Sequence, residues 1–368
     1  MLYNKNNVYL IINWRRGKLM ANKKRFLSSM LTALVLSAAI GSGSVYAAAV
    51  KRTDGGDGGR IGTANQVALD LFNKCDNVIL VNGYGYADAV SATPLAKQLN
   101  APILLTHGQT LETEVASTIK SLGATKIYIV GGTGVVSEDI ENTLEDNYEV
   151  ERIAGTTDTT RMGTNAEVAE RVLEMSNQKT AMLVNGQDGY ADSLSVASIA
   201  AQKGYPVLFA STKEVASVVK DVITSKSLAI QAVGGEGVLP QSVVASVGGT
   251  KVTNDTADRF ATNIAVLNYF KENGGLDFTN IYVAAGGSTQ DQFADALVAS
   301  AAAAKTGSPL VLTGVGAGST QVTNANSYIL SNATDDSNII IVGGTSSVSS
   351  EIEAVLKNND DLEIIGIE

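Results

Sequence analysis

Residues 78–106 read VILVNGYGYADAVSATPLAKQLNAPILLT, and this stretch decides the fold. An apolar run, 78–81, is followed by a glycine-containing loop, an aromatic-Ala-Asp step into a helical pattern, and a second apolar run, 103–105, that a proline precedes. Short apolar runs that do not alternate with polar residues are typical of strands buried on both faces of a parallel sheet. The stretch therefore predicts a strand, a helix and a second strand.

The same pattern returns in residues 181–210 and again in residues 281–313. The aspartate of the step and the proline before the second apolar run keep one spacing in all three copies, at Asp88 and Pro102, Asp192 and Pro206, and Asp295 and Pro309. An Arg-led helical pattern precedes each copy, with a threonine three residues after the arginine, at Arg60 and Thr63, Arg161 and Thr164, and Arg259 and Thr262. The chain is thus a triplicated unit.

Each unit alternates helical and strand patterns. In the first, the quoted stretch is followed by a helical pattern at 111–122, a strand at 127–130, a helix at 137–144 that opens with Ser137, and a short strand at 149–153. Alternation of this kind with buried strands predicts right-handed crossovers and a parallel sheet. A unit of about 100 residues has the size of one domain.

We therefore expect an α/β fold of three tandem parallel-sheet units, at 60–155, 156–255 and 256–368. The apolar run 362–365 is expected to be the terminal strand of the third unit. Residues 48–59, which include the run DGGDGG, are expected to be a linker.

The first 47 residues have the order of a secretory signal peptide. Basic residues at 23–25 precede an apolar run, 26–40, and small residues follow as far as Ala47. This order predicts cleavage after Ala47, with Met20 as an alternative start of the chain. The apolar run is short for a membrane span, so an N-terminal anchor is the lesser alternative. We expect a secreted protein with no membrane span after cleavage.

The charge balance excludes some partners. Residues 1–47 hold seven of the 27 basic residues and no acidic ones, so the remainder carries 20 basic against 37 acidic side chains, a net charge of −17. Nonspecific binding to nucleic acid needs a basic surface that neutralises phosphates. We therefore expect no nucleic-acid partner, and any anion site has to concentrate a few cations locally.

These features resemble the clostridial type 2 cell-wall-binding repeat family of Gram-positive surface-layer and cell-wall proteins. The matching features are the Arg-led helix, the Ala-Asp step, the strand PILLT at 102–106 and the strand end IVGG at 129–132, and they cover nearly the whole chain after residue 59. The resemblance implies Rossmann-like or Toprim-like units in a pseudo-threefold arrangement. It also implies noncovalent anchoring to an anionic secondary wall polysaccharide, with other surface-layer proteins as further partners.

The copies depart from one another at two places. The second unit has Gln231-Ala232 before its glycine pair, and the third has Ala284-Ala285-Gly286 where the others have Val-Asn-Gly. If polymer contacts need identical residues, the three sites are not equivalent.

The candidate polymer-binding residues are repeated polar groups and turns near the ends of strands, where open α/β sheets bind ligands. They are Arg60, Arg161 and Arg259, Asp88, Asp192 and Asp295, Thr106 and Thr313, and the glycine pairs Gly131-Gly132, Gly234-Gly235 and Gly343-Gly344. The arginine fork matches phosphate and carboxylate groups. Each residue type has a structural alternative: the aspartates as helix caps or as partners of the arginines, and the arginines as ties from helix to strand.

Enzymatic readings are less well supported. The one histidine, His107, has no counterpart in the other units and is expected in a solvated loop. With one histidine and one cysteine, the chain offers neither a zinc motif nor a triad hydrolase elbow, and the glycine loops do not complete a phosphate-binding motif. We expect no catalytic residues, metal or cofactor. A wall-polysaccharide hydrolase that uses two carboxylates and a secreted sugar receptor remain alternatives.

Overall fold

The computed structural model describes residues 48–357, apart from 254–255 and 290–291. The predicted signal peptide at 1–47 and the predicted terminal strand at 362–365 lie outside these residues.

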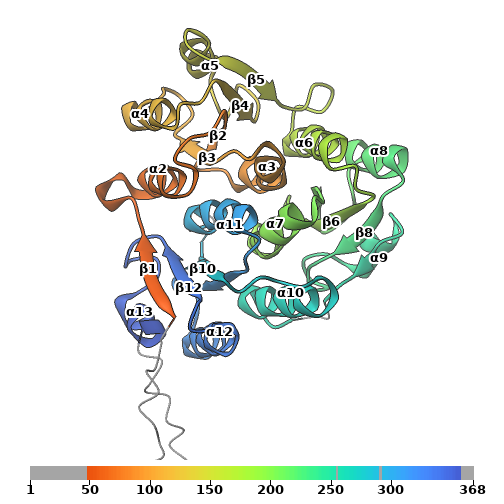
Figure 1. The fold of residues 1–368 in the computed structure, drawn as a ribbon. Helices are drawn as coiled ribbons and strands as arrows, with labels where there is room; N and C mark the ends of the chain where they lie inside the picture. Colours follow the sequence, from red (N-terminus) through yellow and green to blue (C-terminus); the bar gives the residue numbers. More distant parts are fainter. Residues whose placement is uncertain (1–47, 254–255, 290–291, 358–368) are drawn as a thin grey trace, which may run out of the picture. The chain divides into compact units, whose positions relative to one another are not determined.

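The strands form three parallel four-stranded sheets, as the sequence predicts (Figure 1). The first sheet has the order β3-β2-β4-β5, the second β7-β6-β8-β9 and the third β1-β12-β10-β11. Their bounds are β1 Ala49–Thr53, β2 Asn77–Asn82, β3 Ile103–Thr106, β4 Lys126–Val130, β5 Glu149–Ile153, β6 Thr180–Asn185, β7 Val207–Ala210, β8 Ala229–Ala232, β9 Thr250–Lys251, β10 Asn280–Ala285, β11 Leu310–Thr313 and β12 Asn338–Val342.

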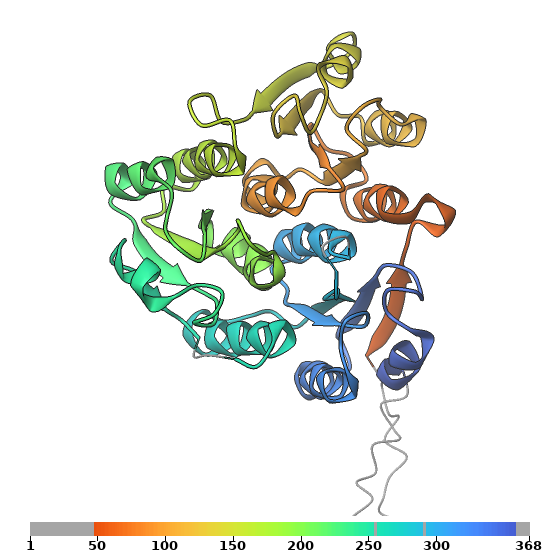
Figure 2. The same ribbon diagram turned by 180° about the vertical axis from the view of Figure 1, so that it is seen from behind.

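Helices connect these strands and cover the sheets (Figure 2). The Arg-led helices are α2 Gly59–Phe72, α6 Arg161–Ser176 and α10 Arg259–Gly274. The helices that begin at the Ala-Asp steps are α3 Tyr86–Leu99, α7 Ala191–Lys203 and α11 Ala294–Thr306. The outer helices are α4 Thr113–Leu122, α5 Glu138–Glu145, α8 Ser217–Lys226, α9 Gln241–Ala245, α12 Ser319–Asn332 and α13 Ser350–Lys357, and a 3-10 turn, η1, spans Gly56–Gly58.

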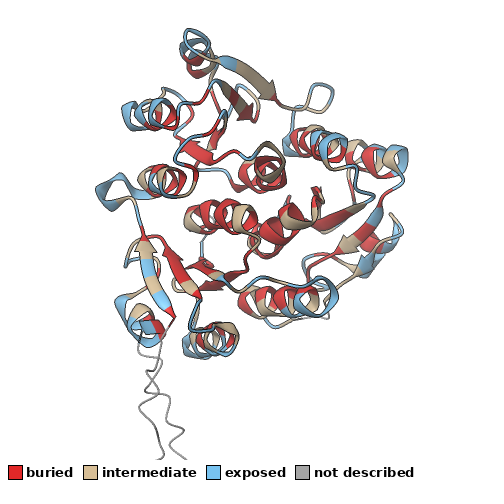
Figure 3. Cartoon of the chain, viewed as in Figure 1, coloured by how far each residue is buried: buried red, intermediate tan, exposed pale blue. Residues whose placement is uncertain are grey.

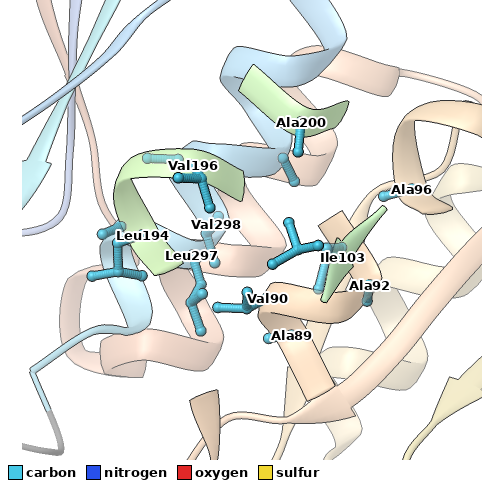
Figure 4. Close-up of a cluster of buried hydrophobic side chains, with 14 of the residues drawn as sticks. Ala89, Val90, Ala92, Ala96, Ile103, Leu194, Val196, Ala200, Leu297 and Val298 are labelled. Atoms are coloured by element: carbon cyan, nitrogen blue, oxygen red, sulfur yellow. The ribbon is translucent and has the colours of Figure 1, made fainter. Parts of the chain in front are cut away.

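The helices α3, α7 and α11 pack against one another at the centre of the three units. Figure 4 shows their small and branched side chains meeting there, among them Val90, Leu194, Val196 and Leu297. Alanine is frequent in these helices, and small side chains let helix axes approach closely. Burial is densest in this centre and in the strands (Figure 3). The three units thus share one core in a pseudo-threefold arrangement.

The prolines of the repeated stretch stand just before the strands β3, β7 and β11, where a missing N–H leaves no gap in the sheet. Their carbonyl oxygens accept the backbone N–H groups of Ile79, Met182 and Tyr282, each at 3.0 Å. These bonds join the two strands of each copy.

The N-terminal segment differs from the prediction. Residues 48–59 were expected to be a linker, but Ala49–Thr53 forms β1, which lies beside β12 in the third sheet (Figure 1). This is the place that β5 takes beside β4 in the first sheet. The third sheet is therefore completed by the start of the described chain, and the three units form a closed ring.

A largely but not fully buried arginine fixes this closing strand. The Arg52 guanidinium donates to Glu353 at 2.7 Å, to the Gly343 carbonyl at 2.6 Å and to the Val348 carbonyl at 2.8 Å. Arg152 makes the corresponding bonds between β5 and its own unit, to Glu141 and to the carbonyl of Gly131. The equivalence shows that β1 is an integral strand of the third sheet.

Candidate functional site

Three pockets lie where one unit meets the next, and we call them joint 1–2, joint 2–3 and joint 3–1. Each combines the Ala-Asp step and the glycine pair of one unit with the first turn of the Arg-led helix of the next. Their volumes are about 430, 720 and 350 Å³, in that order. The shared lining residues are Asp88, Gly132, Arg161 and Thr164 in joint 1–2, Asp192, Gly235, Arg259 and Thr262 in joint 2–3, and Asp295, Gly344, Arg60 and Thr63 in joint 3–1.

The first glycine of each pair makes room for the aspartate. The backbone φ angles are 123° at Gly131, 141° at Gly234 and 107° at Gly343, a region that favours glycine. A Cβ atom at Gly131 would lie 2.8 Å from the Asp88 Oδ2 atom, and one at Gly343 would lie 2.3 Å from Oδ2 of Asp295. The aspartate of the Ala-Asp step therefore packs directly against the first glycine of the pair.

The aspartates are not helix caps. The N-cap residues of α3, α7 and α11 are Gly85, Tyr190 and Phe293, and at none of these positions does a side chain accept a backbone N–H of the helix. The aspartates instead lie inside the first helical turn, where the helix dipole favours a negative charge. The Asp295 carboxylate accepts the hydroxyl of Ser347 at 2.7 Å. Thus the capping alternative is wrong.

Burial makes these carboxyl groups weaker acids. It raises the pKa of Asp88 to about 6, against the opposing charge of Arg161. Burial likewise raises the pKa of Asp192, opposed by the Thr262 hydroxyl and Arg259, and the pKa of Asp295, opposed by Ser347 and Arg60. Each joint therefore sets an acid of raised pKa in the field of the arginine of the next unit.

The arginines tie helix to strand, which confirms their structural alternative. The Nη1 atoms of Arg60, Arg161 and Arg259 donate to the carbonyl oxygens of Gly83, Gly186 and Gly286 at 2.8, 3.3 and 3.1 Å. These bonds hold each guanidinium at the edge of its joint. A structural tie and a cation facing a pocket are combined in one side chain.

An aromatic cluster at the centre of the ring supports the arginines. Tyr86, Tyr190 and Phe293, the aromatic residues of the three steps, have ring centroids 5.5 to 6.0 Å apart. The Arg161 Nη1 atom donates to the Tyr86 hydroxyl at 2.7 Å, and Nη1 of Arg259 donates to that of Tyr190 at 3.0 Å. The sequence shows the aromatic-Ala-Asp pattern of each unit, but it does not show that the three aromatic side chains contact one another.

Joint 3–1 is built differently because Phe293 has no hydroxyl. Its ring lies 5.8 Å from the Arg60 guanidinium carbon, which also stacks 4.4 Å from the ring centre of Tyr84. The three joints therefore also differ at the aromatic position.

Five of the candidate residues do not line the joints: the first glycine of each pair, which packs against the aspartate, and the two threonines. Thr106 and Thr313 are fully buried at the ends of β3 and β11 and are not among the residues that line the three joints. The Thr106 hydroxyl accepts the N–H of Gly108. By contrast, the threonines that follow the arginines, Thr63, Thr164 and Thr262, line the joints. Their recurrence in all three units was the sequence signal that could have identified them as site residues.

The joints offer binding groups for a polyhydroxylated or anionic ligand: guanidinium, carboxyl, hydroxyl and glycine backbone. His107 lies outside them, exposed and bonded through Nδ1 to Glu112 at 2.7 Å, as its predicted loop position requires. Within the described ranges no group of three or more His, Cys, Asp or Glu side chains is placed to hold a metal ion. In the same part of the chain, every helix is too short or too polar to cross a membrane.

Sequence comparison finds relatives that share this architecture. The family model described as cell wall binding domain 2 (CWB2) matches residues 52–141, 152–244 and 254–353. The N-acetylmuramoyl-L-alanine amidase LytC of Bacillus subtilis (strain 168) is 33% identical over 312 residues, which are 84% of this chain and 58% of LytC. The amidase enhancer of the same organism is 34% identical over 149 residues, which are 40% of this chain and 20% of that protein.

Two solved structures from Clostridium difficile have the same fold. Cwp6 superimposes with a TM-score of 0.72 at 25% identity, over 84% of this chain and 48% of that chain. Cwp8 superimposes with a TM-score of 0.70 at 27% identity, over 91% of this chain and 55% of that chain. This chain therefore spans about half the length of the structures it matches, and little more than half of LytC.

Proposed function

Because this chain belongs to the cell wall binding domain 2 family, we propose that it attaches noncovalently to the Gram-positive cell wall by binding an anionic wall polysaccharide in its three joints. The observation that carries the proposal is the threefold recurrence of one pocket chemistry, an arginine opposite a partly buried aspartate beside a glycine turn. The family assignment supports attachment to the wall, and the chemistry of the joints supports the kind of polymer.

The joint residues suit a charged polysaccharide. A guanidinium binds phosphate or carboxylate groups through two parallel N–H donors. The carboxyl oxygens and threonine hydroxyls can exchange hydrogen bonds with sugar hydroxyls, and the glycine pair lets a ligand approach the backbone closely. The proposed contacts are those of Arg60, Arg161 and Arg259, of Asp88, Asp192 and Asp295, and of Gly132, Gly235 and Gly344.

Three similar sites favour retention on a repetitive polymer. Once one joint holds a chain, the effective concentration of neighbouring segments at the other joints is high, so weak contacts add to a long-lived attachment. Turnover would gain nothing from triplication. We therefore propose a binding role without catalysis, preceded by secretion under the direction of residues 1–47.

The direct test is sedimentation of the purified protein with cell walls. We expect the protein to sediment with intact walls and to remain in solution with walls stripped of their secondary polymer. Equal binding to both preparations would refute the proposal. Release of soluble sugar from isolated wall polysaccharide, abolished by a single carboxylate substitution, would instead establish the hydrolase alternative. A thermal shift with a small free sugar alone, without wall binding, would establish the receptor.

A further inference from the structure

The first unit carries an exposed aromatic surface at the rim of joint 1–2. The Tyr84 ring lines this joint and the residue is 53% exposed. The His107 imidazole stacks with this ring, with 4.9 Å between the ring centres and 27° between the ring planes, and the His107 side chain is 58% exposed. We call these two rings the aromatic platform.

Exposed apolar side chains gather at the joints. Five large apolar side chains are exposed in the part of the chain that the structure describes. Three of them line joints, Tyr84 and Val135 in joint 1–2 and Val238 in joint 2–3. Single exposed apolar residues need no explanation, but their concentration on the rim of polar pockets indicates a contact surface for a ligand.

Fixed contacts hold the platform in place. The Nδ1 atom of His107 lies 2.7 Å from Oε1 of Glu112, and its Nε2 atom lies 2.8 Å from the Tyr84 hydroxyl. An ionised carboxylate only accepts hydrogen bonds, so Nδ1 carries the proton and Nε2 of the neutral ring accepts the Tyr84 O–H. The Arg60 guanidinium carbon lies 4.4 Å from the ring centre of Tyr84, within the range of cation–π contacts.

The loop that carries Tyr84 is anchored by Asn82 at the end of β2. The Asn82 Oδ1 atom accepts the backbone N–H of Tyr84 at 2.7 Å. Its Nδ2 atom donates to the carbonyl oxygens of Val135 and His107 at 2.7 and 3.2 Å. One amide thus joins the two loops of the platform to the loop behind the glycine pair. A surface ordered before binding loses little conformational entropy when a ligand arrives.

The second unit has the same anchor without the platform. Asn185 accepts the N–H of Gln187 at 3.0 Å, so Gln187 takes the place of Tyr84. Directly after β7, Ser211 takes the place that His107 has after β3. In the third unit glycine holds both places. The fold of a unit therefore does not require the platform, and a binding role explains it better than packing does.

The platform suits the apolar face of a sugar ring. One face of a pyranose presents C–H groups, while its hydroxyl groups point outward around the ring, so this face can pack against an aromatic ring as other apolar groups do. The Arg161 guanidinium in the adjoining joint suits an anionic group. We propose that the aromatic platform stacks against an uncharged pyranose residue of the wall polysaccharide while joint 1–2 holds the neighbouring anionic group.

The platform also lies where two joints adjoin. Tyr84 lines joint 1–2, and Arg60, which packs on its ring, lines joint 3–1. A polymer can therefore continue from one joint to the other across the platform. The inference rests on the proposed function and deepens it, because it places an uncharged sugar beside the anionic group of the polymer and gives the first unit a contact that the other two lack.

The single histidine of the chain makes the platform directly observable. In a protein without a histidine tag, the imidazole proton signals of an NMR spectrum come from His107 alone. We expect these signals to shift when isolated wall polysaccharide is added at constant pH, and to saturate together with the heat of binding in a calorimetric titration. Tyr84→Gln, which introduces the residue of the second unit, should weaken polymer binding about threefold to tenfold and keep the thermal midpoint.

Two further variants isolate the ring contact. Tyr84→Phe keeps the ring and loses only the hydroxyl, so it should bind nearly as tightly as the unchanged protein. Met175→Gln is the matched control, because Met175 is an exposed apolar residue of α6 that lines none of the joints, and it should leave binding unchanged.

Three results overturn the inference and leave the proposed function intact. They are Tyr84→Gln binding as tightly as the unchanged protein, Tyr84→Phe binding as weakly as Tyr84→Gln, and imidazole signals that stay in place when the polymer is bound. Absence of any polymer binding by the unchanged protein overturns both the inference and the proposed function.

Discussion

At the scale of single residues, each joint places a carboxyl group opposite an arginine. Burial of that carboxyl group costs folding free energy when the group is ionised. A carboxyl whose pKa is higher in the folded chain than in the unfolded chain binds more protons in the folded state. Folding is then weakened as the pH rises through the interval between the two values. For Asp88 that interval runs from the ordinary 3.8 to about 6.

We expect Asp88→Asn to reduce the loss of stability between pH 4 and pH 7. The loss removed should be about 1–2 kcal/mol, less than the full shift implies because the side chain is partly exposed. Thermal unfolding of both proteins across this range measures it. A wild-type stability that rises between pH 4 and pH 6, with no difference from the variant, would contradict the assignment.

The same carboxyl groups should make wall binding depend on pH. Protonation of Asp88, Asp192 and Asp295 removes negative charge from the joints while the phosphates or carboxylates of the polymer stay largely ionised. We expect affinity for walls to increase as the pH falls from 7 to 5, and the increase to be smaller in Asp88→Asn. Sedimentation at constant ionic strength measures this, since salt also screens the contacts. Stronger binding at pH 7 than at pH 5 would contradict it.

The hydroxyl of Tyr86 links two units at the centre of the ring. It donates to the Gly186 carbonyl at 3.0 Å and accepts from Arg161. Tyr86→Phe should lower the free energy of unfolding by about 1–2 kcal/mol, the contribution of such buried bonds. The ring itself should fit, because phenylalanine holds the equivalent place at Phe293. Urea denaturation provides the measurement, and an unchanged midpoint would show that the hydroxyl does not link the units.

At the scale of secondary-structure elements, the apolar runs and the proline spacing were enough to predict the strands β2 and β3 and their copies. The short strand β1 was missed because Lys51 and Arg52 interrupt its apolar pattern and because glycines follow it. A signal was present: residues 50–52 read VKR and residues 150–152 read VER, so the segment resembles the strand that precedes the second unit. Its pairing with β12, almost 300 residues away, depends on the tertiary structure.

The closing strand β1 provides a test of the ring. Arg52→Ala removes the bonds to Gly343 and Val348 and leaves Glu353 without its Arg52 partner, which should cost about 2–4 kcal/mol for a largely buried pair. Hydrogen exchange should become faster in β12 and α13 and stay unchanged in β6 and β7. Arg152→Ala is the matched variant and should have the same effect in β4 and α5. Unchanged exchange in β12 would mean that β1 does not hold the third sheet.

At the scale of the whole molecule, triplication predicted three units, whereas the joints between them could not be predicted. Joints 1–2 and 2–3 are formed by residues about 70 positions apart, such as Asp88 and Arg161, and joint 3–1 brings together Asp295 and Arg60 from opposite ends of the described chain. A sequence pattern does not connect such residues. The candidate arginines and aspartates were placed together, but the buried threonines of β3 and β11 were not. The departure of the third unit at Phe293 acquires meaning only when the three folded units are compared.

Multivalent attachment also has a consequence at this scale. Arg60→Gln, Arg161→Gln or Arg259→Gln alone should weaken wall binding modestly, because two joints remain, whereas the three together should reduce it far more than any single change. Sedimentation with walls at several protein concentrations distinguishes these variants, and thermal midpoints show whether each stays folded. A single variant as weak as the triple one would mean that one joint carries the binding.

The central claim is that the joints bind the wall polysaccharide without cleaving it. Calorimetric titration of the purified protein with isolated wall polysaccharide, followed by sizing of the recovered polymer, tests this most directly. The account predicts saturable binding that is lost in the folded triple arginine variant, with the polymer recovered at its original length. Binding unchanged by the triple substitution, or a shortened polymer, would contradict it.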